Sequence, residues 1–175
     1  RDCLLSRGLG DVYKRQLFTV QLDFALAERF DMIYIDENGE KARPLIIHRS
    51  SIGCYERTLA MLIEKYNGAF PLWMAPEQVR VLSLTDRTAD NAKAVARELT
   101  AAGLRANADV RSEKLGKKIR EAQLEKVPYV LVIGDKEAEQ GVVAVRQRTE
   151  GDLGTMQVSD FIALAKEEVA SKARK

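Results

Sequence analysis

One histidine, His48, is the first candidate for chemistry, because an imidazole can bind a metal ion or exchange a proton near neutral pH. It ends an apolar run, PLIIH, that predicts a strand buried on both faces. A zinc site needs three or four ligands, and Cys54 is the only other soft donor nearby. Spacing alone therefore favours a hydrogen-bonded histidine, and a metal role would need ligands from outside this chain.

Gly53 and Arg57 form a second candidate, since they lie one helical turn apart. A glycine lets a flat group approach the backbone, and a guanidinium can stack on a ring or hold a phosphate. A helix packed tightly at its glycine, with a solvated or ion-paired arginine, explains the same spacing. Both interpretations stay open at this point.

A basic cluster is the third candidate, with five cations and one acid within residues 111–120. Such a cluster can hold a phosphate backbone, although a solvated helix face would look the same. It contains no aromatic residue, so stacking on bases would need another source. Two further arginines are expected on one face of a strand in the same sheet. The cations are Arg111, Lys114, Lys117, Lys118 and Arg120, with Arg146 and Arg148 on the strand.

The composition indicates a globular chain of one or two small domains: 175 residues, 46% of them hydrophobic and 31% charged. The net charge of +2 is too small to imply nucleic acid by itself. No apolar run approaches the roughly 18 residues that span a bilayer, so no membrane association is expected. Two cysteines cannot build a disulfide framework, which favours a reduced, cytoplasmic location.

The first part of the chain predicts an α+β unit. Residues 1–16 show no periodicity and are interpreted as a non-native or disordered leader. Strands are predicted at 18–24, 32–35 and 44–48, joined into one antiparallel sheet, with a hairpin turn at Asn38-Gly39. A helix capped by Ser50 or Ser51 should follow and end before Gly68.

The pattern changes after residues 71–76, whose two prolines predict a linker. Residues 77–175 predict an α/β domain of order βαβαββα, a mixed sheet flanked by helices. Ser159 is expected to cap its last helix. The predicted strands are 79–84, 105–110, 129–133 and 142–148, and the predicted helices are 90–102, 114–126 and 160–171.

Many separate motifs, in order from residue 17 to the end, resemble the C-terminal part of threonyl-tRNA synthetases. In the first half they are TVQLDF (19–24), AERF (27–30), PLIIHR (44–49), GCYER (53–57), GAFPLW (68–73) and APEQV (75–79). In the second half they are DVR (109–111), EKLG (113–116), KIRE (118–121), VPY (127–129), GDKE (134–137), VAVR (143–146) and GDLG (151–154).

The resemblance implies that residues 17–70 end a class II catalytic domain and that residues 53–57 are its third signature motif. Arg57 would then stack on the adenine of ATP, which binds with Mg²⁺, while Gln21 would contact the adenylate or the tRNA acceptor end. His48 would be one of three zinc ligands, with a Cys and a His upstream. The remaining residues that would bind substrate are Thr19, Gly53 and Cys54, although many relatives carry Ser at the last position.

Residues 77–175 would be the anticodon-binding domain. The parent enzyme would be a homodimer, and its partners would be tRNA(Thr), threonine and ATP. Arg120, Glu137 and Arg146 match positions that read or hold the anticodon loop, and Ser112 stands where relatives carry Asn. The first two class II motifs are missing, so the chain alone is expected to be inactive as a threonine–tRNA ligase. Two alternatives stay open: a free-standing RNA-binding module, and a prolyl, glycyl or histidyl enzyme.

Overall fold

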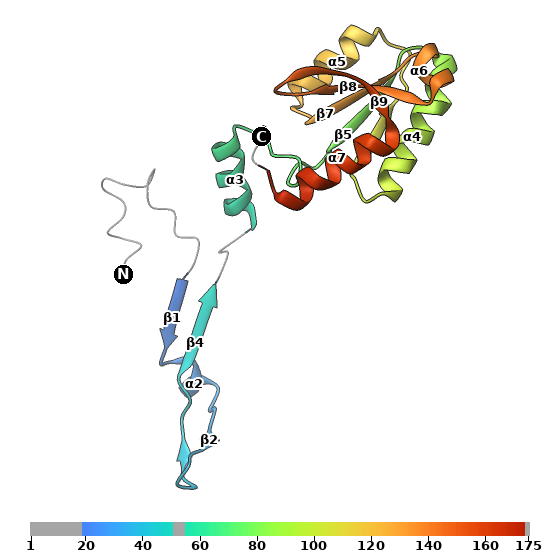
Figure 1. Cartoon of the computed structure of the whole chain (residues 1–175). Helices are drawn as coiled ribbons and strands as arrows, with labels where there is room; N and C mark the ends of the chain where they lie inside the picture. Colours follow the sequence, from blue (N-terminus) through green and yellow to red (C-terminus); the bar gives the residue numbers. More distant parts are fainter. Residues whose placement is uncertain (1–18, 51–54, 174–175) are drawn as a thin grey trace, which may run out of the picture. The chain divides into compact units, whose positions relative to one another are not determined.

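The computed structural model describes residues 19–50 and 55–173 (Figure 1). Its internal contacts divide the chain into two compact units, Arg1–Leu62 and Ile63–Lys175, with the division inside helix α3. Each unit is described by itself below. No helix in the described ranges is both long enough and apolar enough to cross a membrane.

The first unit contains two small antiparallel ladders. Strand β1 (Thr19–Asp23) pairs with β4 (Ile46–Ser50), and β2 (Tyr34–Ile35) pairs with β3 (Lys41–Ala42), after the short helix α2 (Leu26–Arg29). The turn between β2 and β3 confirms the predicted hairpin. Its Asp36 carboxylate accepts the Asn38 and Glu40 N–H groups at 2.9 and 2.8 Å, and Gly39 takes a φ of +81° that favours glycine.

Two expectations for this unit are wrong. The predicted strands form two separate two-stranded ladders instead of one three-stranded sheet. The strand around His48 is also not buried on both faces, because Ile47 is 60% exposed. A strand is buried on both sides only when other layers cover its sheet, and none of the described residues supplies them here.

Helix α3 (Tyr55–Tyr66) has an apolar stripe, yet none of its residues is buried. It ends as predicted, since Gly68 adopts a φ of +72° and donates its N–H to the carbonyl of Ile63 at 2.9 Å. The caps predicted at Ser50 and Ser51 depend on residues 51–54, which lie outside the described part of the chain.

The second unit is built on a five-stranded mixed sheet of order β6-β5-β7-β8-β9. The first three strands in this order are parallel, and the last two run antiparallel to their neighbours. This confirms the predicted mixed sheet flanked by helices. The strands are β5 (Val79–Ser83), β6 (Ala106–Asp109), β7 (Tyr129–Ile133), β8 (Val142–Gln147) and β9 (Gly151–Gln157).

Helices cover the two faces of this sheet unequally. Helices α4 (Ala89–Ala101) and α7 (Val158–Ser171) pack on one face, where Leu99 and Phe161 lie fully buried against β5, β7 and β8. Helix α5 (Leu115–Leu124) packs on the other face, where Ala122 contacts the cluster that contains Leu82 and Val130. Among the described residues, α5 is the long helix that packs on this second face (Figure 1).

The predicted order lacked two elements, α6 (Asp135–Gln140) and β9, as well as a short 3₁₀ turn, η1 (Asp86–Thr88). Helix α6 is short and has no apolar stripe, and β9 contains Gly151 and Gly154, both with positive φ. Pairing with β8 forms β9 despite its weak propensity. Ser159 does not cap α7, because the N-cap is Gln157 and the Ser159 hydroxyl contacts Asp160.

Residues 71–76, the predicted linker, are anchored to the second unit. Leu72 is 1% exposed and belongs to the main core. Its carbonyl accepts the Gln78 side-chain amide at 2.8 Å, and Arg105 donates to the carbonyls of Ala75 and Trp73 at 2.9 and 3.1 Å. These contacts make the segment a packed part of the fold.

Candidate functional site

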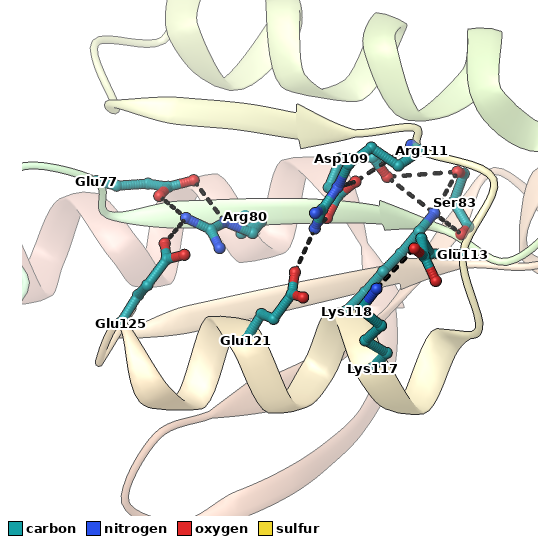
Figure 2. Close-up of polar contacts among 10 residues, drawn as sticks. All are labelled: Glu77, Arg80, Ser83, Asp109, Arg111, Glu113, Lys117, Lys118, Glu121 and Glu125. Atoms are coloured by element: carbon teal, nitrogen blue, oxygen red, sulfur yellow. Dashed lines mark hydrogen bonds and ion pairs between the residues drawn. The ribbon is translucent and has the colours of Figure 1, made fainter.

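Arg111 stands between two carboxylates beside helix α5 (Figure 2). Its guanidinium donates to Asp109 at 2.6 and 2.9 Å and to Glu121 at 2.6 Å. The Arg111 hydrogen bond lowers the pKa of Asp109, and the Asp109 hydrogen bond raises the pKa of Arg111. This arginine is therefore engaged within the fold.

Lys118 points from α5 into the molecule and is only 1% exposed. Its Nζ donates to the carbonyl oxygens of Ser83 and Asp109 at 3.0 and 3.3 Å, and lies 3.3 Å from the Ser83 hydroxyl. These residues end β5 and β6, so the ammonium joins two strand ends to the helix (Figure 2). Lys118 is thus excluded from any surface that meets a phosphate.

Two further ion pairs flank the same helix. Arg80 donates to both Glu77 and Glu125, which raises its pKa, chiefly through the Glu77 hydrogen bond. Lys117 and Glu113 lie one turn apart, with 2.6 Å between the Lys117 Nζ and the Glu113 Oε1. The hydrogen bond to Lys117 lowers the pKa of Glu113. Within the basic cluster seen in the sequence, Arg111 and Lys117 are therefore ion-paired, and Lys118 is buried.

Two cations of the cluster remain available. Lys114 and Arg120 are exposed and form no ion pair or hydrogen bond through their side chains with the described residues. Arg148 does not share a strand face with Arg146 as expected, because β8 ends at Gln147. Its guanidinium donates instead to the carbonyls of Lys126, Phe70 and Ala69, and burial lowers its pKa.

The four residues expected to read RNA come from helix α5, from strand β8 and from the segments that follow the ends of β6 and β7. Ser112 follows the end of β6, and Glu137 lies in α6, just after the end of β7. Arg120 is exposed on α5. Arg146 lies opposite Val130 of the α5 cluster, and the buried Val145 beside it in the strand faces the other way.

No hydrogen bond or ion pair joins any two of these four residues in the described ranges. Glu137 accepts the Gly134 N–H at 3.0 Å, which caps the start of α6. The guanidinium groups of Arg120 and Arg146 form no hydrogen bond or ion pair with a described residue. Hydrogen-bond donors and acceptors on side chains of this kind are the groups that bind the base edges of unpaired nucleotides.

In the first unit, Gln21 and His48 face each other across the β1–β4 ladder. The His48 Nε2 lies 3.3 Å from the Asp23 carboxylate, which also accepts the Leu26 and Ala25 N–H groups at 2.9 Å. The Leu26 hydrogen bond is the main cause that lowers the pKa of Asp23. No group of three or more possible metal ligands occurs among the described residues.

The other predicted catalytic residues are less well defined. Arg57 is exposed near the start of α3. Thr19 begins β1, and only its backbone is described. Gly53 and Cys54, as well as the leader at 1–16, lie outside the described residues, so the predicted motif at 53–57 is described only from Tyr55 onward.

Comparison with known families assigns both parts of the chain. Residues 78–168 match the family described as "Anticodon binding domain". The chain belongs to the anticodon-binding domain family. Residues 12–66 match the "tRNA synthetase class II core domain (G, H, P, S and T)". The sheet with its α5 face thus belongs to the anticodon-binding domain, and β1 to α3 lie within the segment that is similar to the class II core.

Individual relatives indicate which kind of synthetase the chain is similar to. The chain is 60% identical to a threonine–tRNA ligase of Clostridium botulinum (strain Eklund 17B / Type B) over 158 residues, covering 90% of this chain and 25% of the relative. It is 56% identical to the enzyme named threonine–tRNA ligase in Symbiobacterium thermophilum, over 91% of this chain and 25% of that one. The chain therefore spans about a quarter of the length of these relatives.

A solved structure agrees. The RNA binding domain of threonyl-tRNA synthetase from Cryptosporidium parvum Iowa II superposes with a TM-score of 0.72 at 38% identity, over 87% of this chain and 39% of that one. The resemblance to the C-terminal region of threonyl-tRNA synthetases is thereby confirmed. Because these relatives are named for threonine, they favour similarity to a threonyl enzyme over similarity to the prolyl, glycyl and histidyl enzymes.

The interpretation of the basic cluster missed the buried role of Lys118. A signal was present, because Lys118 falls in the same helical stripe as Leu115, Ile119 and Ala122. A lysine in an apolar stripe indicates either that this helix face is not buried or that the ammonium group is buried and donates to carbonyl oxygens. The anchoring role of Arg148 had no comparable signal, since its partners Ala69 and Phe70 are distant in sequence.

Proposed function

We propose that residues 77–175 bind the anticodon loop of tRNA(Thr), with Arg120, Glu137, Arg146 and Ser112 as the contacting residues. The match of residues 78–168 to the anticodon-binding domain family carries this proposal. The unpaired donors of Arg120 and Arg146 support it, because a guanidinium can bind a base edge or a phosphate in two places at once.

The other two residues would add hydrogen-bonding groups. The Ser112 hydroxyl can donate and accept, and the Glu137 carboxylate can accept from an exocyclic amine. Lys114 would add a phosphate contact, which strengthens binding without reading sequence. Arg111, Lys117 and Lys118 take no part, since their charges are held by the fold.

We further propose that the first unit contributes to a class II synthetase site in a protein that activates threonine with ATP and transfers it to tRNA(Thr). Residues 17–70 would be its catalytic part and residues 71–76 the connection. Arg57 would contact the adenine and phosphates of ATP, which binds with Mg²⁺. Exposed Gln21, on β1, would contact the adenylate or the acceptor end. Thr19, Gly53 and Cys54 would line the substrate site.

The zinc site expected at His48 is considered separately. The described residues offer one imidazole and one carboxylate close together, His48 and Asp23, and no third donor. This set alone does not fit a zinc ion, which takes four ligands in most protein sites. We therefore propose His48 only as one ligand among others from upstream and assign zinc no step. A homodimeric parent enzyme and a cytoplasmic location belong to the same proposal.

Binding to a labelled anticodon arm tests the proposed function of the second unit. Fluorescence anisotropy would compare the arm of tRNA(Thr) with the same arm carrying three replaced anticodon bases. The proposal predicts at least about a hundredfold tighter binding of the first, because each wrong base costs on the order of 1–3 kcal/mol and the three costs add. Equal affinity for both arms would reduce the unit to a non-specific RNA binder. No saturable binding of either arm would refute the proposal.

A further inference from the structure

A cavity of about 280 Å³ lies at the edge of the sheet where β7 begins, beside helix α7. Its polar lining consists of Tyr129, Gln147, Glu150, Glu167, Glu168 and Ser171, and its apolar lining includes Leu153 and Leu164. None of these residues belongs to the proposed RNA-binding set. Ser112 and Glu137 of that set follow the opposite ends of the parallel strands.

A hydrogen-bond chain forms the inner wall of the cavity. The Gln147 amide donates to the Tyr129 hydroxyl at 2.9 Å, and this hydroxyl donates to the Glu168 carboxylate at 2.7 Å. The direction of the chain is fixed, because a carboxylate only accepts. Burial, followed by the contact with Glu168, raises the pKa of Tyr129, so its hydroxyl stays protonated and keeps donating.

One atom of this wall is left without a partner. Gln147 is 9% exposed, and its Oε1 is buried with no hydrogen-bond partner in the described part of the chain. A buried carbonyl oxygen without a donor costs free energy that a bound N–H group would recover. The amide nitrogen already donates to Tyr129, so Oε1 calls for a donor.

The charges of the cavity specify what kind of donor. Glu167 and Glu168 form no ion pair with a described residue, and Glu150 adds a third carboxylate to the lining. The nearby Arg148 guanidinium is committed to three carbonyl oxygens. Two leucines and negative charges together suit an aliphatic stem that ends in a cation.

We propose that this cavity binds an alkyl guanidinium or alkyl ammonium group. The cation contacts Glu167 and Glu168, one of its N–H groups reaches the Gln147 Oε1, and its stem packs on Leu153 and Leu164. A free polyamine and a basic side chain share this chemistry. The chain itself carries Arg174 and Lys175 directly after Ala173, which lines the cavity.

Agmatine, a butyl guanidinium with an amine, is the probe. The full chain, labelled with ¹⁵N, would be titrated while the side-chain amide of Gln147 and the backbone amide of Tyr129 are followed by NMR. We expect saturable shifts at both, and about tenfold weaker binding after Glu167→Gln, since a charged hydrogen bond is lost. The matched control Glu139→Gln, on exposed α6, should leave binding unchanged.

A chain ending at Ala173 identifies the source of the cation. If agmatine binds the shortened chain much more tightly than the full chain, the site normally takes Arg174 or Lys175 of the chain itself. If both bind equally, the site takes a free or external cation. Absence of saturable shifts in both chains overturns the proposal, and so does equal weakening by Glu167→Gln and Glu139→Gln. Loss of RNA binding would leave these results unaffected, so the two proposals fail separately.

Discussion

The ammonium group of Lys118 lies 3.0 Å from the carbonyl oxygen of Ser83, the last residue of β5. In the sequence, Lys118 stands within the most basic stretch of the chain, yet in the fold it is almost completely buried. One cation thus satisfies the strand-end carbonyls of Ser83 and Asp109 while the rest of its helix packs on the sheet. Part of the local excess of positive charge therefore belongs to a buried group that stabilises the fold.

Replacing this lysine tests its structural role. Lys118→Met keeps the aliphatic stem but leaves two buried carbonyl oxygens without their donor, so we expect a loss of about 3 kcal/mol in unfolding free energy. Urea denaturation of the variant measures this loss. The control Lys114→Met, at an exposed and unpaired neighbour, should change stability by less than about 0.5 kcal/mol. Equal effects of the two changes would contradict a buried role for Lys118.

The Asp109–Arg111 pair predicts how stability depends on acid. Because the Arg111 hydrogen bond lowers the folded pKa of Asp109, the unfolded chain binds protons more readily at low pH. The stabilisation is complete above the ordinary carboxyl pKa of about 4 and is lost as the pH falls through the lowered folded value.

Asp109→Asn should therefore lower stability at pH 7 and have progressively less effect below about pH 4. Urea midpoints of both proteins, measured from pH 7 down to pH 2.5, give this comparison. A difference between variant and wild type that stays constant over the whole range would show that Asp109 does not contribute through its charge.

The hydrogen bonds of Arg148 indicate which segment of the chain should resist proteolysis. Its guanidinium holds the carbonyls of Phe70 and Ala69, and Gln78 and Arg105 hold residues 72–75. Chymotrypsin under native conditions should therefore cut ahead of Phe70 and spare the segment that follows. Arg148→Met should release this segment, open a new cleavage site after Trp73 and cost about 1–2 kcal/mol in unfolding free energy. The bond after Phe70 is not a usable site, because Pro71 follows it and chymotrypsin does not cut before proline.

The exposed Arg97 on α4 offers a matched control for this test, since Arg97→Met removes a guanidinium without a partner among the described residues. Its cleavage pattern should match that of the unmodified chain. Early cleavage after Trp73 in the unmodified chain would show that the segment is not held by Arg148.

Much of the second unit could be predicted from the sequence because its elements carry strong local signals. Strand β7 is an uninterrupted apolar run, and α4 is an alanine-rich stripe ended by Gly103. Strand β9 could not be found this way, since its pairing with β8 and not its own composition makes it a strand. Ion pairs such as Arg80–Glu125 join residues far apart in sequence, so spacing does not reveal them.

The candidate site follows the same division. Charge clustering singled out Arg120 and Arg146 among other cations, but only the resemblance to a family gave them a role in reading the anticodon, because an exposed arginine on a helix or strand has no distinctive spacing. What the fold adds is which cations are available: Lys118 and Arg111 are engaged, and Arg120 and Arg146 are not. His48 was expected in a buried strand, and its side chain is in fact 48% exposed and paired with Asp23.

The most direct test of the account is how Arg146→Ala and Arg120→Ala change discrimination between the anticodon arm of tRNA(Thr) and the arm with replaced anticodon bases. Anisotropy titrations at one fixed salt concentration would compare both variants with Arg97→Ala, on the helix that covers the other sheet face. We predict that each of the first two variants weakens binding of the cognate arm by about tenfold, that at least one of them also reduces discrimination, and that Arg97→Ala changes neither. Equal losses in all three variants, or full discrimination in both site variants, would contradict the assignment of these residues to anticodon recognition.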